Sequence, residues 1–465
     1  MTNYNEYFRG KKITIMGLGL LGGALNDAIF LAKCGAELTI TDLKSEKELA
    51  PSLKKLKSYK LISYKLGHHD LEDFKDKDFI LQPGNVPPDS PYLLEAQKNN
   101  IPIHESESLF MQCALGVKVV GITGTRGKST TTALIYEILK SAFGQKVHIA
   151  GNVKGKSTLA LLKDIKEGDM VVLEMDSWCL HGLGEIKKSP QISVFTNLMP
   201  DHLNYYLKSA NPSTSYVDAM EKYFTDKAQI YLNQKVDDYL ICGERIAERI
   251  GKINSQKIIT KKEDVPKVWK VKIPGDHNLE NIACAIAVAR VLKIEEKIIK
   301  KAVENFIGVE GRLEFLREYK GIKIYNDTTA TTPDATIAAL KGLNDSIYNL
   351  QSTGYKKIIL ILGGADKNLD MSGLVKEIPK YCKSVILLSG TGTIKIENEK
   401  IKIQNENPKL KINKAENLKK AVTEAIKECK RGDILLFSPA FASFGMFKNE
   451  FDRGEQFLKI IKKLK

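Results

Sequence analysis

The sequence predicts an α/β protein built from three domains. Its 465 residues correspond to two to four domains at roughly 100–200 residues each. Short apolar runs rich in β-formers alternate with helical patterns along the whole chain, which is typical of parallel or mostly parallel sheets. Glycine-rich turns follow two of the apolar runs. We expect the domains to span residues 1–111, 112–308 and 309–465.

The composition excludes several classes of protein. The chain is 43% hydrophobic and 27% charged, which is ordinary for a globular protein and excludes collagen-like, coiled-coil and largely disordered chains. No apolar run reaches the ~18 residues that a membrane helix needs, and the first ten residues are too polar for a signal peptide. We therefore expect a cytoplasmic protein with no membrane partner.

The charged residues and the cysteines narrow the choice of partners. The formal net charge is +15, but only nine of the 71 basic residues are arginine and the lysines are spread along the chain. A nucleic-acid surface would show clustered basic residues with interleaved aromatic residues, so we expect no nucleic-acid partner. A generally positive field suits small anions such as nucleotides and carboxylates. The seven scattered cysteines contain no Cys-x-x-Cys pair and predict reduced thiols.

The first domain opens with a βαβ pattern. A strand at 12–17 runs into the glycine-rich segment 17–23, a helical pattern continues to about Cys34, and a strand at 37–41 ends at Asp42. Glycines let the backbone approach a diphosphate at a helix N-terminus, and an acid about 20 residues further on can bind a ribose hydroxyl. A dinucleotide dehydrogenase, a nucleotide-sugar binder and a plain glycine-rich turn all fit this pattern.

A second glycine loop begins the second domain. It follows the strand 117–123, reads GTRGKSTT over 124–131, and precedes a helical pattern. The spacing is not that of a Walker A loop, but the chemistry is the same. Backbone N–H groups can cradle phosphates, Lys128 can neutralise the β- and γ-phosphates, and the Ser129 hydroxyl can reach Mg²⁺. The alternative is a glycine turn with a solvated lysine, and the flanking strand and helix favour the phosphate loop.

Further elements are expected from apolar runs of matching length. The expected strands are 78–82, 101–103, 170–173, 192–196, 323–325, 357–362, 384–388 and 433–437, and the expected helices are 133–141 and 281–292.

The second glycine loop resembles the ATP loop of the Mur ligase superfamily, and the resemblance extends over the whole chain. Further motifs are NDTTAT at 326–331, GGADK at 363–367, SPAFAS at 438–443 and FKN at 447–449. They look most like those of the members that add D-glutamate. The resemblance implies a Rossmann-like nucleotide-sugar domain, a central P-loop ATPase-type domain with a mostly parallel sheet, and a Rossmann-like amino-acid domain.

The resemblance also implies an activity, which is ATP-driven amide synthesis through an acyl phosphate in peptidoglycan precursor synthesis. The implied substrates are UDP-N-acetylmuramoyl-L-alanine and D-glutamate, the implied cofactors are ATP and Mg²⁺ at two sites, and the expected state is a monomer. Because a carboxylate and a triphosphate must meet, such a site needs cations, and because an acyl phosphate hydrolyses, it must exclude water.

Site residues are carried over by motif. Lys128 belongs to the catalytic set; Glu174 and Ser129 match one metal site; His202 and Lys227 match the second, where the family carbamylates the lysine. Bland alternatives are an exposed acid, a loop histidine and a solvated lysine. The implied ATP contacts are Gly124, Thr125, Arg126, Gly127, Lys128, Ser129, Thr130, Asn281, Arg312 and Asp327. The implied nucleotide-sugar contacts are Gly19, Leu20, Leu21, Asp42, Lys44, Gly84 and Asn152, and the implied D-glutamate contacts are Thr331, Lys367 and Ser443.

The chain departs from the family pattern at several positions. Thr329 and Thr332 stand where a lysine and an asparagine are usual, Glu450 interrupts a Lys-Asn-Phe motif, and DSWCL at 176–180 replaces Ser-Ser-Phe-Gln-Leu. Leu21 stands where a hydroxyl could help to bind the diphosphate. The alternatives are therefore a Mur-type ligase for a different amino acid, a folylpolyglutamate-synthase-like enzyme, an NAD-binding oxidoreductase and a non-enzymatic nucleotide sensor.

Overall fold

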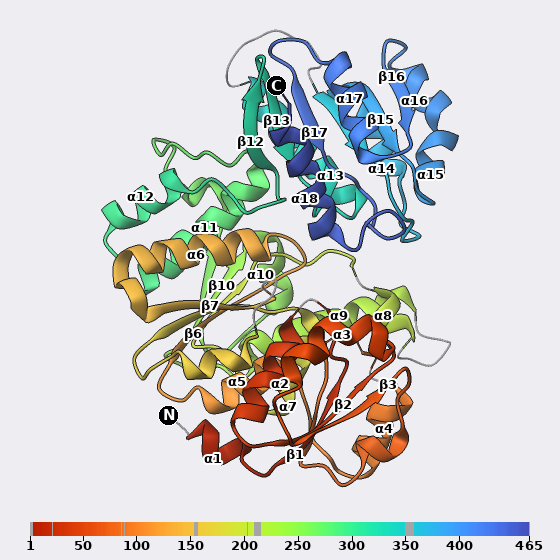
Figure 1. Cartoon of the computed structure of the whole chain (residues 1–465). Helices are drawn as coiled ribbons and strands as arrows, with labels where there is room; N and C mark the ends of the chain where they lie inside the picture. The colour runs from red at the N-terminus through yellow and green to blue at the C-terminus, as the bar shows by residue number, and fades with distance from the viewer. Residues whose placement is uncertain are drawn as a thin grey trace. The chain divides into compact units, whose positions relative to one another are not determined.

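The computed structural model describes residues 3–20, 22–84, 86–87, 89–152, 157–201, 203–208, 215–348 and 358–464. Its contacts divide the chain into two compact units. Unit 1 comprises residues 1–265 and 280–302, and unit 2 comprises residues 266–279 and 303–465. The helices and strands, labelled in Figure 1, form three sheets with intervening helices, which confirms the α/β class. The three domain boundaries expected from the sequence stay predictions.

The first sheet of unit 1 is parallel throughout and has the strand order β3-β2-β1-β4-β5. Its inner strands are almost continuously buried, as expected where helices cover both faces. The strands are β1 Lys12–Met16, β2 Glu37–Asp42, β3 Ile62–Leu66, β4 Phe79–Leu81 and β5 Ile103–His104. The helices are α1 Tyr4–Phe8, α2 Gly23–Lys33, α3 Glu46–Leu56, 3₁₀ helix η1 Leu71–Phe74, α4 Pro91–Lys98 and α5 Ser106–Cys113.

The second sheet of unit 1 is also parallel, in the order β11-β10-β9-β6-β8-β7. The strands are β6 Lys118–Thr123, β7 Val147–Gly151, β8 Met170–Glu174, β9 Ile192–Phe195, β10 Tyr239–Gly243 and β11 Gln256–Thr260. The helices are α6 Lys128–Phe143, η2 Gly144–Lys146, η3 Leu159–Lys163, α7 Ser177–Glu185, α8 Leu203–Lys208, α9 Tyr216–Leu232, α10 Glu244–Ile250, η4 Lys262–Asp264, α11 Asp276–Val291 and α12 Glu296–Asn305. Helix α11 begins in unit 2 and ends in unit 1.

The sheet of unit 2 is mixed, in the order β12-β13-β17-β14-β15-β16. Only β12 runs antiparallel to its neighbour; Lys320 and Gly321, both with positive φ, form the two-residue turn between β12 and β13. The strands are β12 Glu314–Tyr319, β13 Ile322–Asn326, β14 Ile358–Leu362, β15 Cys382–Leu388, β16 Lys411–Ala415 and β17 Ile434–Phe437. The helices are α13 Pro333–Tyr348, α14 Ser372–Tyr381, α15 Thr393–Asn398, α16 Lys400–Glu406, α17 Leu418–Glu428 and α18 Glu450–Lys462.

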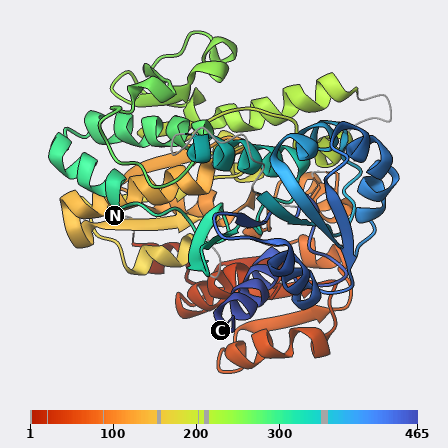
Figure 2. The same cartoon turned by 90° about the horizontal axis from the view of Figure 1, so that it is seen from above.

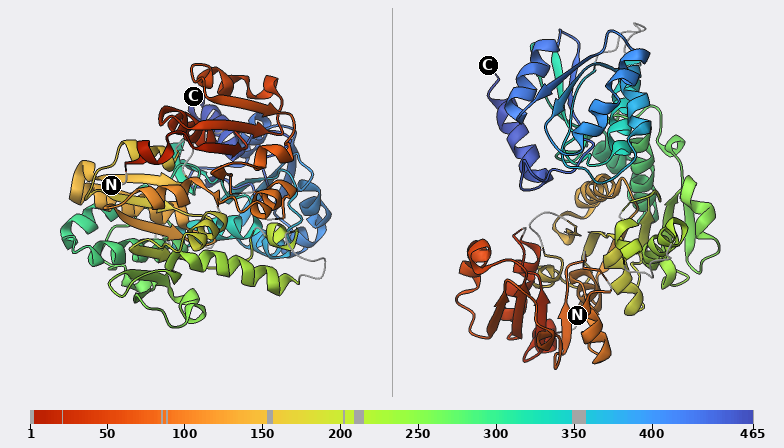
Figure 3. Two further views of the ribbon diagram at one scale, coloured as in Figure 1. Left: turned by 90° about the horizontal axis from the view of Figure 1, so that it is seen from below. Right: turned by 90° about the vertical axis from the view of Figure 1, so that its right-hand side faces the viewer.

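Helices cover both faces of this sheet, as the right-hand view of Figure 3 shows. Alternate residues of β14 point to opposite faces: Ile359 and Ile361 pack in a core with α17 and α18, while Leu360 and Leu362 pack in a core with α13 and α14. Helix α18, dark blue in Figure 2, packs against α17 and β13. Such two-sided burial explains the apolar runs that predicted β14, β15 and β17.

Two further expectations concern the whole chain. All seven cysteines are free thiols, as their scattered positions predicted. Within the residues described above, no helix is both long and apolar enough to cross a membrane.

Candidate functional site

The second glycine loop joins β6 to α6, as the sequence predicts. Gly124 has φ 141° and Gly127 has φ 82°, and the left-handed Gly127 starts the helix at Lys128, five residues before the helix expected at 133. A Cβ on Gly127 would lie 2.1 Å from Asn281 Oδ1, and one on Gly124 would lie 1.9 Å from Thr196 Oγ1. Both positions therefore require glycine, and the predicted ATP contact Asn281 lies against the loop.

Hydrogen bonds attach the loop to the segment that follows β9. Arg126 N donates to Asn197 Oδ1 at 2.9 Å, and the Arg126 guanidinium pairs with Asp201 at 2.7 Å. Thr125 Oγ1 accepts from Met199 N at 2.9 Å. The backbone of the loop is thus fixed by chain-distant partners before any ligand binds, which reduces the ordering that binding would require.

A hydroxyl and a carboxylate meet at the start of α6. Ser129 Oγ donates to Glu174 Oε1 at 3.0 Å, and Glu174 ends β8 with only 4% of its surface exposed. The exposed-acid alternative for Glu174 is therefore wrong. Hard oxygen donors of this kind suit Mg²⁺, so the pair fits the ion that the sequence assigns to it. Among the residues the structure covers, no group of three or more His, Cys, Asp or Glu could hold a metal, and His202 lies outside the described residues.

Lys128 lies at the mouth of the same loop. Its amino group donates to Gly124 O at 3.1 Å and lies 3.3 Å from Asp176 Oδ1. The lysine is therefore already engaged by protein groups, one of which is an acid that stands in the departing segment 176–180. Sequence analysis did not single out Asp176 as a site residue.

Lys227, in α9, is buried beneath the loop with 1% of its surface exposed. Its Nζ donates to Gly124 O at 2.9 Å and Thr123 Oγ1 at 3.3 Å, and lies 4.8 Å from the ring centroid of Tyr223. Burial, and next the positive charge of Lys128, lower the pKa of Lys227 from 10.5 to about 7. The solvated-lysine alternative is wrong, and much of this amine is neutral near pH 7.

The first glycine loop joins β1 to α2 and is held by Asp42. Leu18 N and Gly19 N donate to Asp42 Oδ2 at 2.9 and 3.0 Å, and Lys44 N donates to Oδ1 at 2.8 Å. The structure therefore brings together three of the predicted nucleotide-sugar residues, with Asp42 fixing the loop backbone. Leu20 is 56% exposed. Leu21 lies outside the described residues.

The other two predicted nucleotide-sugar residues meet the departing segment 176–180. Asn152, which follows β7, donates from Nδ2 to Asp176 Oδ2 at 2.8 Å. Gly84 packs so closely on Trp178 that a Cβ would lie 1.8 Å from the indole Cδ1. Trp178 and Asp176 are thus contacts of predicted site residues, and the only signal for them in the sequence is that they differ from the family pattern.

In unit 2, three loops meet at the carboxyl edge of the sheet. They follow β13, β17 and β14, which are neighbours in the sheet. Lys367 Nζ donates to Thr331 Oγ1 at 3.0 Å, and the backbones of Ala365 and Ala442 pair, which places Ser443 beside the loop of Lys367. Ser443 is 3% exposed. In open α/β sheets ligands bind at this edge, so the arrangement suits the amino-acid site that the sequence predicts.

The remaining predicted ATP contacts of unit 2 differ in burial. Asp327 is buried and accepts from Ser438 Oγ at 2.7 Å and Leu313 N at 2.9 Å. Burial raises the pKa of Asp327 to about 7. Arg312 is exposed, and Asn278, for which a helix cap was the alternative, donates from Nδ2 to Pro274 O at 2.7 Å.

Sequence analysis missed Arg453, the largest fully buried side chain of the chain as described. It projects from α18 and donates to Thr328 O at 2.7 Å, Thr328 Oγ1 at 3.2 Å and Phe441 O at 3.1 Å. Burial lowers its pKa to about 10. The guanidinium links the loop after β13, which carries Thr331, to the loop after β17, which carries Ser443. Nothing in the sequence distinguishes this arginine from a surface residue of an amphipathic helix.

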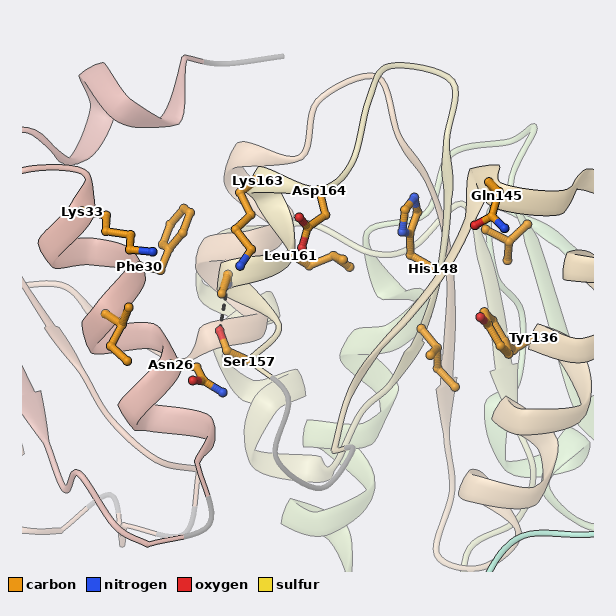
Figure 4. Close-up of a pocket in the computed structure, with 14 residues that line it drawn as sticks. Asn26, Phe30, Lys33, Tyr136, Gln145, His148, Ser157, Leu161, Lys163 and Asp164 are labelled. Carbon is orange, nitrogen blue, oxygen red and sulfur yellow. Dashed lines mark hydrogen bonds between the residues drawn. The ribbon is translucent and has the colours of Figure 1, made fainter. Parts of the chain in front are cut away.

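A pocket of about 480 Å³ lies elsewhere in unit 1, between α2, η3 and the β7–α6 region. Figure 4 shows Phe30 and Lys33 of α2 on one side, His148 and Tyr136 on the other, and Lys163 of η3 between them. Among the described residues, none of those assigned to a substrate from the sequence lines this pocket. Binding at the loops therefore does not depend on it.

The two glycine loops, the Ser129–Glu174 pair and the parallel sheets define the class: an α/β protein that binds nucleotide phosphates. Comparison with known proteins is more specific. The model of the Mur ligase middle domain matches residues 122–264, and that of the Mur ligase glutamate ligase domain matches residues 311–441. The chain belongs to the Mur ligase family.

Full-length relatives carry one name. UDP-N-acetylmuramoylalanine--D-glutamate ligase of Roseiflexus sp. (strain RS-1) is 34% identical over 97% of this chain and 98% of its own. The proteins of that name from Borreliella afzelii (strain PKo) and Clostridioides difficile (strain 630) are 35% and 32% identical, covering 96% and 98% of this chain and 96% and 99% of their own.

Solved structures show the same fold. UDP-N-acetylmuramate-alanine ligase MurC from Thermotoga maritima has a TM-score of 0.61 at 19% identity, covering 98% of this chain and 100% of its own. MurF from Acinetobacter baumannii has a TM-score of 0.53 at 13% identity, with coverages of 99% and 92%. At such identities the likeness concerns the fold alone.

Proposed function

We propose that this protein is an ATP-dependent ligase that joins D-glutamate to UDP-N-acetylmuramoyl-L-alanine in peptidoglycan precursor synthesis. The observation that carries the proposal is the similarity, over 97% of the chain, to a relative named as the ligase of these two substrates. The relationship favours a nucleotide-sugar role for the first glycine loop over a dehydrogenase role. We further infer that the protein acts as a cytoplasmic monomer.

The central loop supplies the phosphate chemistry. The N–H groups of residues 124–128 and the charge of Lys128 hold the triphosphate, with Thr130, Asn281, Arg312 and Asp327 as further ATP contacts. Ser129 and Glu174 would hold Mg²⁺, which when bound offsets charge on the β- and γ-phosphates. The γ-phosphate passes to the alanine carboxylate, the D-glutamate amine attacks the acyl carbon and loses a proton, and inorganic phosphate leaves.

Lys227 is proposed to act as a carbamate. Its neutral amine can attack CO₂, forming an N–C bond and releasing a proton, so that a buried cation becomes an anion. The lowered pKa of Lys227 supports this step because only the neutral amine is a nucleophile. The nearby cation Lys128 would favour the anionic product. The carbamate and His202 would hold a second Mg²⁺; the role of His202 rests on the family resemblance alone.

The substrate contacts follow the loops of the two units. We propose that Gly19, Leu20, Leu21, Asp42, Lys44, Gly84 and Asn152 contact the nucleotide-sugar. Lys367 supplies a cation for the D-glutamate side-chain carboxylate, and Thr331 and Ser443 supply hydroxyls. The hydrogen bond between Lys367 and Thr331 supports this assignment. Thr329, which replaces the usual lysine, donates instead to Gly311 O at 2.9 Å.

Phosphate release from ATP tests the proposal. The wild-type protein is assayed with UDP-N-acetylmuramoyl-L-alanine and a panel of L- and D-amino acids, and D-glutamate is expected to be strongly preferred over neutral and L-configured ones. Lys128→Ala is the matched control and should lose at least about 100-fold, as the removal of a charge-stabilising group typically does. Preference for a neutral amino acid would refute the D-glutamate assignment, and no ATP-dependent release with any amino acid would refute the ligase.

A further inference from the structure

We propose that Asp176 is a positioning residue that acts on both nucleotide sites of unit 1. It restrains the loop lysine in the ATP-free protein and orients the amide of Asn152. Removal of its charge should therefore strengthen ATP binding, and removal of its hydrogen bond should weaken binding of the nucleotide-sugar. The inference rests on the proposed function, which assigns Lys128 to ATP and Asn152 to the sugar substrate.

The topology places Asp176 between the two sites. Strand β8 lies between β6 and β7 in a parallel sheet, so the residues that follow these three strands meet at one edge. Lys128 follows β6, Asn152 follows β7, and Asp176 follows β8 by two residues. An acid at this position can reach both neighbours, and the contacts show that it does.

Each carboxylate oxygen of Asp176 has its own partner. Oδ1 lies 3.3 Å from Lys128 Nζ, and Oδ2 accepts from Asn152 Nδ2 at 2.8 Å. The side chains of Lys128 and Asp176 are 15% and 17% exposed, so solvent screens the ion pair only partly. The charge is therefore able to compete with a phosphate for the same amino group.

The orientation of Asp176 is not the one its place in the helix favours. Asp176 is the N-cap of α7, where an aspartate side chain ordinarily accepts a hydrogen bond from the first turn of the helix. Here the side chain makes no capping hydrogen bond. The carboxylate is turned away from its own helix, towards residues of two other elements, and the usual serine of the family pattern would carry no charge at this point.

Two effects of opposite sign follow. To bind a phosphate, Lys128 must exchange Asp176 for the ligand, and the carboxylate also repels the phosphate charge, so Asp176 lowers ATP affinity. For the sugar, the hydrogen bond from Asn152 Nδ2 fixes the amide and leaves Oδ1 on its other side to accept from a substrate hydroxyl. Loss of that bond frees the amide and lowers affinity for the nucleotide-sugar.

The test is calorimetric titration of the full chain with ATP, with and without Mg²⁺, and with UDP-N-acetylmuramoyl-L-alanine. Asp176→Asn and Asp176→Ser should both bind ATP about 3- to 10-fold tighter than wild type, the range for release of a partly buried ion pair. Asp176→Ser, which is too short to reach Asn152, should bind the nucleotide-sugar about threefold more weakly. Asp169→Asn, which removes an acid paired with His148 at 3.0 Å, is the control for net charge and should leave ATP affinity unchanged.

Tighter binding distinguishes positioning from a merely structural role, since damage to the fold would weaken ATP binding. Unchanged or weaker ATP binding in both Asp176 variants would overturn the inference, as would equal tightening in Asp169→Asn. Weakening that appears only with Mg²⁺ would make Asp176 a metal contact and would also overturn it. Failure of the wild-type protein to bind ATP at all would instead refute the proposed function itself.

Discussion

Replacement of Lys227 by methionine should make unit 1 more stable while removing the activity. The lysine amine is buried beneath the phosphate loop, and its pKa falls from 10.5 to about 7. Folding therefore disfavours the protonated amine, and the wild-type chain carries this unfavourable free energy at neutral pH. Methionine has a similar length and no charge to bury.

The magnitude follows from the burial and the contacts. A difference of 3.5 pKa units between 10.5 and 7 corresponds to about 5 kcal/mol, of which about 4 kcal/mol applies at pH 7 because half of the folded chains are already neutral. Methionine loses the hydrogen bonds to Gly124 O and Thr123 Oγ1, worth about 1 kcal/mol each. The expected gain in the free energy of unfolding is therefore about 2 kcal/mol.

The gain should depend on pH in a defined direction. Below about pH 7 Lys227 is protonated in both states, and the disadvantage of the wild type is constant. Between pH 7 and 10 the unfolded chain binds more protons at this residue than the folded chain does, so wild-type stability rises with pH relative to the variant. The difference should shrink by about 1 kcal/mol per pH unit.

Urea unfolding in bicarbonate-free buffer measures the effect. The chain has two tryptophans, Trp178 in unit 1 and Trp269 in unit 2, so a Trp269→Phe background makes fluorescence a reporter of unit 1. If Lys227→Met is less stable than wild type at pH 7, or if the difference does not change with pH, the reasoning is wrong. In the activity assay, Lys227→Ala should be inactive and partly rescued by short-chain carboxylic acids, whereas a fully active Lys227→Arg would exclude the carbamate.

Two further predictions concern unit 2. Arg453→Lys keeps the charge but cannot reach all three oxygens of Thr328 and Phe441, so urea unfolding followed at Trp269 should show a loss of about 2 kcal/mol; unchanged stability would mean that the guanidinium does not link the two loops. Lys367→Met should raise the KM for D-glutamate about 10- to 100-fold, the range for a charge-assisted hydrogen bond, with little change in the KM for ATP; equal changes in both would contradict a contact to the amino acid.

Much of the phosphate loop could be predicted because its determinants are local. Gly124, Gly127 and Lys128 are adjacent in the sequence, and the strand and helix around them have clear periodicity. The buried strands β6, β14 and β17 were found for the same reason, since apolar residues on both faces produce continuous runs. The strands β3, β7, β10, β11, β12 and β16 were missed; β3 and β12, for example, lie at sheet edges and are largely exposed, so they lack such a run.

The sequence by itself determined the α/β class, the two glycine loops and the motifs that mark the family, because backbone conformation at glycine and strand periodicity depend on neighbouring residues. Tertiary structure alone decided the charge state of Lys227, the double contact of Asp176 and the burial of Arg453. Each depends on groups far apart in the sequence: Lys227 lies about a hundred residues from the oxygens that accept its hydrogen bonds. Desolvation and pairing are set by what the fold brings together, so no local pattern in the sequence encodes them.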